Sequence, residues 1–197
     1  MLVPTGARAD RHEAEWSVRP FAGLTELQED GASAQRAVVG GLALGLAYGV
    51  SNELDLGAEL VALATTRPRF TDAAILDGGA PYRGPLSRRA GSALVLLGPT
   101  WRLGVSWIPV ITLAAGAGAR YRSDGTFTET GITLDEKRAT VVLDLAATAR
   151  AGIEHRINRR LVVGAYASAL ASWGPSAPLL PIASISLGVS YVHYPLW

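Results

Sequence analysis

Side chains that commonly carry out chemistry are sparse in this chain of 197 residues. Cysteine is absent, which excludes disulfides, thiolate metal sites and cysteine nucleophiles. The three histidines, His12, His155 and His193, lie far apart in sequence, and the acidic residues are scattered. Metal ligands must converge, and no spacing here predicts that they do. We therefore expect neither a metal site nor a cofactor.

The overall charge gives no reason to expect a nucleic-acid partner. The formal net charge is +1, and Arg156, Arg159 and Arg160 form only a local basic cluster. Charged residues make up 18% of the chain and hydrophobic residues 49%, so the chain is more apolar than an average soluble domain. Its length suits one domain.

Charged residues do occur inside apolar segments, where their spacing is informative. In residues 42–64, LALGLAYGVSNELDLGAELVALA, Leu44 and Leu56 lie on one parity, and Asp55 and Glu59 lie on the other among small residues. In an extended strand this pattern places the acids on one face and the leucines on the opposite face. Both signs of charge occur on the polar parity, so the charges can form ion pairs there. The expected inner charges are Arg19, Asp55, Glu59, Arg120, Asp144 and Arg150.

The elements that position these charges are predicted by period-two alternation, which recurs from Trp16 onward. It indicates eight strands, at 15–27, 36–49, 53–67, 89–101, 107–122, 138–154, 160–173 and 182–196. The connections after the second, fourth and sixth strands are short, and the others are longer. The sequence therefore predicts an all-β fold, an eight-stranded antiparallel up-and-down transmembrane β-barrel with short periplasmic turns and longer extracellular loops.

One parity of each strand suits contact with membrane lipid. In the sixth predicted strand Val141, Leu143 and Leu145 lie on one parity, and Asp144 and Arg150 lie on the other. Facing that second parity outward would place arginine in hydrocarbon, at a cost of about 2–4 kcal/mol near the midplane. The small residues around these charges suit the narrow interior of an eight-stranded barrel. We expect a monomer with lipid as its surroundings.

Aromatic residues concentrate near the predicted strand ends, which is typical of interfacial girdles in barrels. The expected girdle residues are Trp16, Tyr48, Trp101, Trp107, Tyr121, Trp173, Tyr191 and Trp197. Of these, Tyr121 and Trp173 mark the end with the long loops.

On these features the chain resembles the eight-stranded outer-membrane barrel superfamily, which includes the outer membrane protein A transmembrane domain and the OmpX-like and OmpW-like barrels. The ending SLGVSYVHYPLW resembles the family's C-terminal assembly signal, although the final residue is Trp and not the commoner Phe, and Pro195 departs from the pattern. The signal residues are Leu187, Gly188, Val189, Tyr191 and Trp197. The resemblance implies a bacterial outer membrane location and the barrel assembly machinery as a partner.

The resemblance also offers an enzymatic alternative, because family members that modify lipid A use a Ser/His pair on the barrel wall. Ser190 and His193 are the nearby candidates here. Their parities are opposite, so one side chain should face the lumen and the other should face lipid. The hydroxyl and the imidazole would then be too far apart for proton transfer between them. We expect no enzyme.

The predicted interior leaves two functions open. Arg19, Glu59 and Arg150 should reach similar heights, at about 3.3 Å per residue, and form an ion-pair layer that gates the lumen or merely lines it. Further along, the inner parity is largely apolar, with Val39, Val61, Leu63, Leu94, Leu96, Val110, Tyr166 and Leu170. OmpW-like barrels admit hydrophobic molecules through such a pocket, so a structural barrel or a passive channel for a small apolar solute is the leading hypothesis.

The alternative is a surface binding or adhesion module, or a barrel subunit of an envelope complex, that uses the 68–88 and 123–137 loops. Residues 1–14 precede the barrel of residues 15–197. Ala7, Arg8 and Ala9 have the small-x-small form of a secretory cleavage site. They indicate either the remnant of a signal peptide that begins upstream, or a chance match.

Overall fold

The computed structural model describes residues 12–29, 32–77, 80–104, 107–123, 125–126, 140–174 and 177–194. Eight strands of the barrel are β1 (Ala14–Leu27), β2 (Gln35–Gly49), β3 (Leu54–Thr65), β6 (Ala90–Arg102), β7 (Trp107–Arg122), β8 (Thr140–Arg156), β9 (Leu161–Gly174) and β10 (Ala177–His193). Two further strands, β4 (Arg69–Asp77) and β5 (Ala80–Ser87), form a separate hairpin. No helix long and apolar enough to cross a membrane occurs in this part of the chain.

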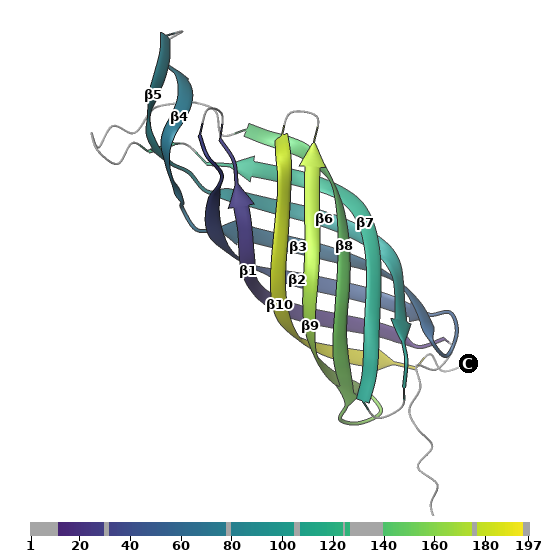
Figure 1. Cartoon of the computed structure of the whole chain (residues 1–197). Helices are drawn as coiled ribbons and strands as arrows, with labels where there is room; N and C mark the ends of the chain where they lie inside the picture. The colour runs from purple at the N-terminus through teal and green to yellow at the C-terminus, as the bar shows by residue number, and fades with distance from the viewer. Residues whose placement is uncertain are drawn as a thin grey trace, which may run out of the picture.

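The eight strands close into a barrel in the order β1-β10-β9-β8-β7-β6-β3-β2, with β2 returning to β1 (Figure 1). Every neighbouring pair is antiparallel. Because β1 pairs with both β10 and β2, none of the eight described barrel strands is an edge strand. The predicted eight-stranded barrel is confirmed, and the strand ends differ from the predicted ones by a few residues, except at the start of β10.

The barrel has two unlike ends. The turn end carries the short connections 50–53, 103–106 and 157–160, and the loop end carries the others. The connection between β9 and β10 is shorter than predicted, because β9 continues to Gly174 and β10 already begins at Ala177. An irregularity in register between Ala177 and Leu180 lets this proline-containing run continue as a strand.

The 68–88 segment contains the β4–β5 hairpin where the sequence predicted only a loop. Phe70 and Leu86 pair across it and are buried. Leu27 at the end of β1 and Ala32 of the β1–β2 connection pack against them. Figure 1 shows the hairpin extending beyond the loop end of the barrel. Its sequence signal is the pair Gly78-Gly79 between two strand-like runs, a spacing that is typical of a tight hairpin.

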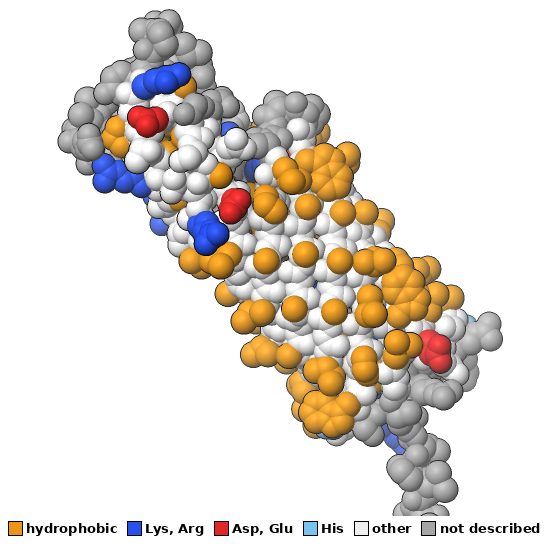
Figure 2. Space-filling model, viewed as in Figure 1, with side chains coloured by type: hydrophobic (Ala, Val, Ile, Leu, Met, Phe, Trp, Pro, Cys, Tyr) orange, Lys and Arg blue, Asp and Glu red, His pale blue; other side chains and the backbone are white. Residues whose placement is uncertain are grey.

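The outside of the barrel is an apolar belt, as the alternation predicts. Leu143 is 78% exposed and Ile185 is 71% exposed, and both belong to the parity that was expected to face lipid. Figure 2 shows hydrophobic side chains over this wall, with charged side chains near the two ends. Asp55 is 3% exposed and faces the interior. Such an outer surface would be costly in water and is stable in hydrocarbon.

Candidate functional site

Three inner charges meet close to the turn end. Arg19 of β1 forms an ion pair with Glu59 of β3, and Arg150 Nη1 of β8 lies 2.8 Å from the same Glu59 oxygen. Arg19 also donates to Ser17 Oγ at 2.8 Å, and Arg150 donates to Thr112 Oγ1 at 3.3 Å. Both guanidiniums therefore share one carboxylate across the lumen.

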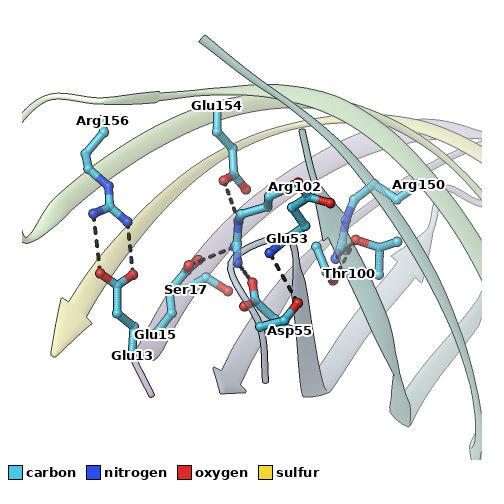
Figure 3. A network of polar contacts seen from close by, with 12 residues as sticks. Glu13, Glu15, Ser17, Glu53, Asp55, Thr100, Arg102, Arg150, Glu154 and Arg156 are labelled. Atoms are coloured by element: carbon cyan, nitrogen blue, oxygen red, sulfur yellow. Dashed lines mark hydrogen bonds and ion pairs between the residues drawn. The ribbon is translucent and has the colours of Figure 1, made fainter. Parts of the chain in front are cut away.

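A second group lies nearer the turns, around Arg102 (Figure 3). Arg102 Nη2 lies 2.7 Å from Glu15, its Nε lies 2.9 Å from Glu154, and its Nη1 pairs with Asp55. The sequence prediction placed Arg102 in a turn and did not select Glu15 or Glu154. Their inner parity was the available signal: Glu15 lies on the parity of Arg19 in the predicted strand 15–27, and Glu154 lies on the parity of Arg150 in the predicted strand 138–154.

Tyr166 of β9 connects these two groups. Its hydroxyl donates to Glu154 Oε1 at 2.8 Å, and the Arg19 and Arg150 guanidinium carbons each lie 5.7 Å from its ring centroid. The ring lies so close to Gly152 and Gly164 that a side chain at either position would collide with it. These inner glycines therefore make room for one aromatic ring.

The two remaining inner charges lie apart from this network, towards the loop end. Arg120 Nε of β7 is 2.6 Å from Asp144 of β8, and Arg120 Nη2 donates to the Ser172 carbonyl and hydroxyl, each at 2.9 Å. The six expected inner charges thus divide into separate groups at different heights. The Arg120–Asp144 pair follows from the antiparallel register of β7 and β8, which places Arg120 beside Val142 and two residues from Asp144.

Between these charged groups the interior is packed with apolar side chains. The buried cluster contains Val39, Ala43, Val61, Leu63, Leu94, Leu96, Ala146, Leu180 and Ile182, with Leu170 packed against it. Two interior cavities, one beside Tyr166 and one beside Phe21, measure ≈ 40 Å³ and ≈ 30 Å³, enough for a few water molecules. Where the sequence allowed an apolar pocket, the structure therefore has a filled core.

The expected girdle residues lie on the outer surface. Trp16, Tyr48, Trp101, Trp107, Tyr121, Trp173 and Tyr191 are all exposed, and Trp197 lies outside the described residues. At the turn end Trp16 is the cross-strand neighbour of Tyr191. Leu187 and Val189 of the expected assembly signal also face outward, whereas Gly188 faces inward and lies against Arg19 and Tyr166.

The Ser190 and His193 pair is not brought together. Ser190 is buried inside the barrel at 2% exposure, and His193 is exposed on the outside. The hydroxyl and the imidazole thus lie on opposite faces of β10, as their parities predict.

The loop end presents basic side chains next to the hairpin. Residues 66–89 contain five arginines, Arg67, Arg69, Arg83, Arg88 and Arg89, against Asp72 and Asp77. The base of the hairpin is tied to the β7–β8 loop, because Ser87 and Thr126 exchange both backbone hydrogen bonds. Most of the 123–137 loop lies outside the described residues.

Comparison with solved structures identifies the fold. The crystal structure of Ail, the attachment invasion locus protein of Yersinia pestis, is 16% identical, with 93% of this chain and 99% of that chain covered and a TM-score of 0.52. Ail in complex with the heparin analogue sucrose octasulfate gives the same identity and coverage with a TM-score of 0.51. Neisserial surface protein A is 8% identical over 89% of this chain and 96% of that chain, with a TM-score of 0.49.

No protein-family model matches the chain, and no curated protein sequence is similar to it. The chain has the fold of the eight-stranded outer-membrane β-barrels. That fold and the apolar belt together indicate a transmembrane barrel in contact with lipid.

Proposed function

We propose that the protein is a closed outer-membrane barrel that presents a binding or attachment module at its loop end, formed by the β4–β5 hairpin and the loops beside it. The observation that carries this proposal is the filled interior. A small solute would have to displace the Arg102 network, then the apolar cluster around Leu94 and Leu96, then the Arg120–Asp144 pair.

The packing of the hairpin supports a presenting role. Phe70, Ala73 and Leu86 form a small buried cluster with Leu27 and Ala32, so the base of the hairpin is held to the barrel rim. The outer side chains, such as Arg69 and Arg83, are exposed. Exposed loops on a rigid scaffold are a common arrangement for binding sites.

The solved neighbours offer a class of ligand to try first. Ail is described as an attachment protein, and one of its structures holds a sulfated heparin analogue. The arginine excess of residues 66–89 is compatible with an anionic surface ligand of that kind. Heparin is therefore the first probe.

The test is attachment of cells that display the full barrel. A non-adherent Gram-negative host expressing the chain should attach to heparin-coated plates, and replacing residues 71–85 with a short Gly-Ser linker should abolish attachment. A matched linker in place of residues 127–136 tests the other loop. Retention of the folded band in unboiled gel samples controls for barrel assembly. Attachment that survives loss of the hairpin would refute its role.

Three narrower proposals accompany this function. The first is that the outward Leu187, Val189 and Tyr191 serve as the signal read by the barrel assembly machinery. The second is that the barrel works as a monomer. The third is that residues 1–14 include the remnant of a signal peptide cleaved after Ala9. Loss of the assembled band in a Leu187→Asp variant would support the first, and native mass spectrometry tests the second. The N-terminal sequence of the protein purified from outer membranes tests the third.

A further inference from the structure

The tight turn between β8 and β9, residues 157–160, carries two consecutive arginines at the turn end of the barrel (Figure 1). Arg159 and Arg160 are both exposed, and neither forms an ion pair with a carboxylate in the described part of the chain. The neighbouring Arg156, by contrast, is paired with Glu13 at 3.0 Å. The other two short turns, 50–53 and 103–106, contain no basic residue. We call residues 157–160 the arginine turn.

Hydrogen bonds hold the backbone of the arginine turn in place. Asn158 Oδ1 accepts from the backbone N–H of Arg160 at 2.8 Å. The Arg160 carbonyl accepts from the Val192 N–H at 2.8 Å, and the Arg159 carbonyl accepts from the Tyr194 hydroxyl at 3.0 Å. A backbone that is already ordered reduces the entropy lost when a ligand binds. The turn therefore presents both arginines from a fixed position.

The arginine turn lies at the boundary of the apolar belt. Arg160 Nη1 donates to the hydroxyl of Tyr191 at 3.4 Å, and Tyr191 faces outward beside its cross-strand neighbour Trp16. Ile157 of the same turn is also exposed. Outward Tyr and Trp rings of a membrane protein lie at the level of the lipid headgroups. The guanidinium of Arg160 is therefore placed at the depth of the lipid phosphates.

A second basic side chain lies beside an aromatic ring close to the arginine turn. The imidazole of His155, near the end of β8, stacks on the ring of Trp107, with the centroids 4.6 Å apart and an interplanar angle of 29°. His155 is the cross-strand partner of Val163 on β9, the strand that leaves the turn. An imidazole N–H is a donor that a phosphate oxygen can accept. The outer side of the barrel therefore adds a donor next to the two arginines.

The ligand that suits this arrangement is a phosphate group carried by a lipid. A planar guanidinium can donate to two phosphate oxygens at once, and the neighbouring Tyr191 and Ile157 offer apolar contact to the glycerol and acyl parts of the same molecule. Basic side chains near a membrane surface attract anionic lipids. A zwitterionic lipid should bind less well, because its own cationic group already neutralises its phosphate.

We propose that the arginine turn binds the phosphate of an anionic phospholipid in the membrane leaflet at the turn end, with Arg159 and Arg160 as the donors. The inference goes beyond the proposed function, because it concerns the end of the barrel opposite the hairpin. It makes one class of lipid a specific ligand of one turn, in addition to the lipid that surrounds the apolar belt.

The test is native mass spectrometry of the full chain in detergent micelles, titrated with phosphatidylglycerol and, separately, with phosphatidylcholine. Arg159→Gln and Arg160→Gln should each weaken binding of the first phosphatidylglycerol about fivefold, which corresponds to about 1 kcal/mol per arginine near a lipid surface. The double variant should weaken it about 25-fold if the two effects add. Binding of phosphatidylcholine should change by less than about twofold in all three variants.

A matched variant separates this site from a general effect of charge. Arg67→Gln makes the same change at an exposed position of the loop end and should leave the affinity for phosphatidylglycerol within about twofold. The folded band in unboiled gel samples controls for assembly of every variant. Equal affinity in the wild type and the double variant would overturn the proposal and leave the two arginines for an acidic protein partner. A loss in Arg67→Gln as large as that in Arg160→Gln would also overturn it.

Water-soluble glycerol phosphate distinguishes a lipid site from a site for any phosphate ester. It lacks the acyl chains that lie against the belt, so an excess of it should fail to displace phosphatidylglycerol from the wild-type barrel. Displacement at comparable concentrations would overturn the assignment to a membrane lipid. Cells that display the double variant should still attach to heparin, because the hairpin is intact, so failure of this inference and failure of the proposed function are distinguishable.

Discussion

The two ends of this barrel use arginine in opposite ways. At the turn end the described interior holds the acids Glu13, Glu15, Asp55, Glu59 and Glu154 against the arginines Arg19, Arg102, Arg150 and Arg156. At the loop end, Arg69, Arg83 and Arg89 are exposed around the hairpin. Arginine surrounded by carboxylates closes the lumen, whereas exposed arginine near the surface is suited to an external anion.

The contrast also follows from solvation. A charge inside a low-dielectric barrel must be paired, because an uncompensated ion there costs several kcal/mol. A charge at the loop end can remain in contact with water until a ligand replaces it. The interior network should therefore matter for stability, and the loop-end cluster should matter for binding.

The largest expected effect is at Arg102. In an Arg102→Leu variant, Glu15, Asp55 and Glu154 would face one another without their shared cation, which should cost about 3–5 kcal/mol in the free energy of unfolding. Urea unfolding in lipid vesicles measures it. Arg159→Leu, at an exposed turn position, should change stability by less than about 0.5 kcal/mol. Equal losses in the two variants would contradict a stabilising role for the interior network.

A smaller loss is expected when Glu59 becomes Gln. The amide keeps the shape of the side chain but removes the charge that Arg19 and Arg150 share, which should cost about 2–3 kcal/mol of stability. Adding Arg150→Met to this variant should recover part of the loss, because one unpaired cation is then removed. A double variant less stable than either single variant would argue against a shared pair.

Removing only the hydroxyl of Tyr166 should have a moderate effect. Tyr166→Phe deletes the hydrogen bond to Glu154 and keeps the ring between the two arginines, so stability should fall by about 1–2 kcal/mol. Tyr121→Phe at the lipid-facing loop end is the matched control and should have little effect. The same unfolding titration compares the two.

The smallest effect is expected for an exposed pair at the loop end. Glu26 and Arg36 lie 3.8 Å apart, with side chains 57% and 84% exposed. Glu26→Gln should therefore change stability by no more than about 0–1 kcal/mol, and less at high salt. A loss as large as that of Glu59→Gln would show that the loop end is as tightly coupled as the interior.

Much of this architecture could be read from the sequence, because lipid outside and a narrow lumen inside impose a strict alternation on every strand. Asp55, Glu59 and Arg150 were placed on the inner face by parity alone. The choice of partner was harder, since pairing across the lumen depends on the stagger of the strands around the barrel. Arg102 was missed because its strand was ended one residue early.

Two other features are harder to predict from the sequence. Leu94 and Leu96 would occupy the same inner positions in a hollow or a filled barrel, and only the packing of Leu180 and Ile182 against their cluster distinguishes the two. The sequence predicts a loop where the hairpin lies, because the two strands are short and rich in turn-forming residues. Its stability comes from Phe70 and Leu86 contacting the distant Leu27, which no local pattern reveals.

The central claim is that the lumen is closed and that function lies at the loop end. Single-channel recording in planar bilayers tests it most directly, with the purified wild-type barrel and the Glu59→Gln variant. The expected result is no conducting steps in either, because the apolar cluster still fills the lumen when one layer of charge is weakened. Discrete, persistent steps from the wild-type barrel would contradict the claim and restore passage of solutes as the function.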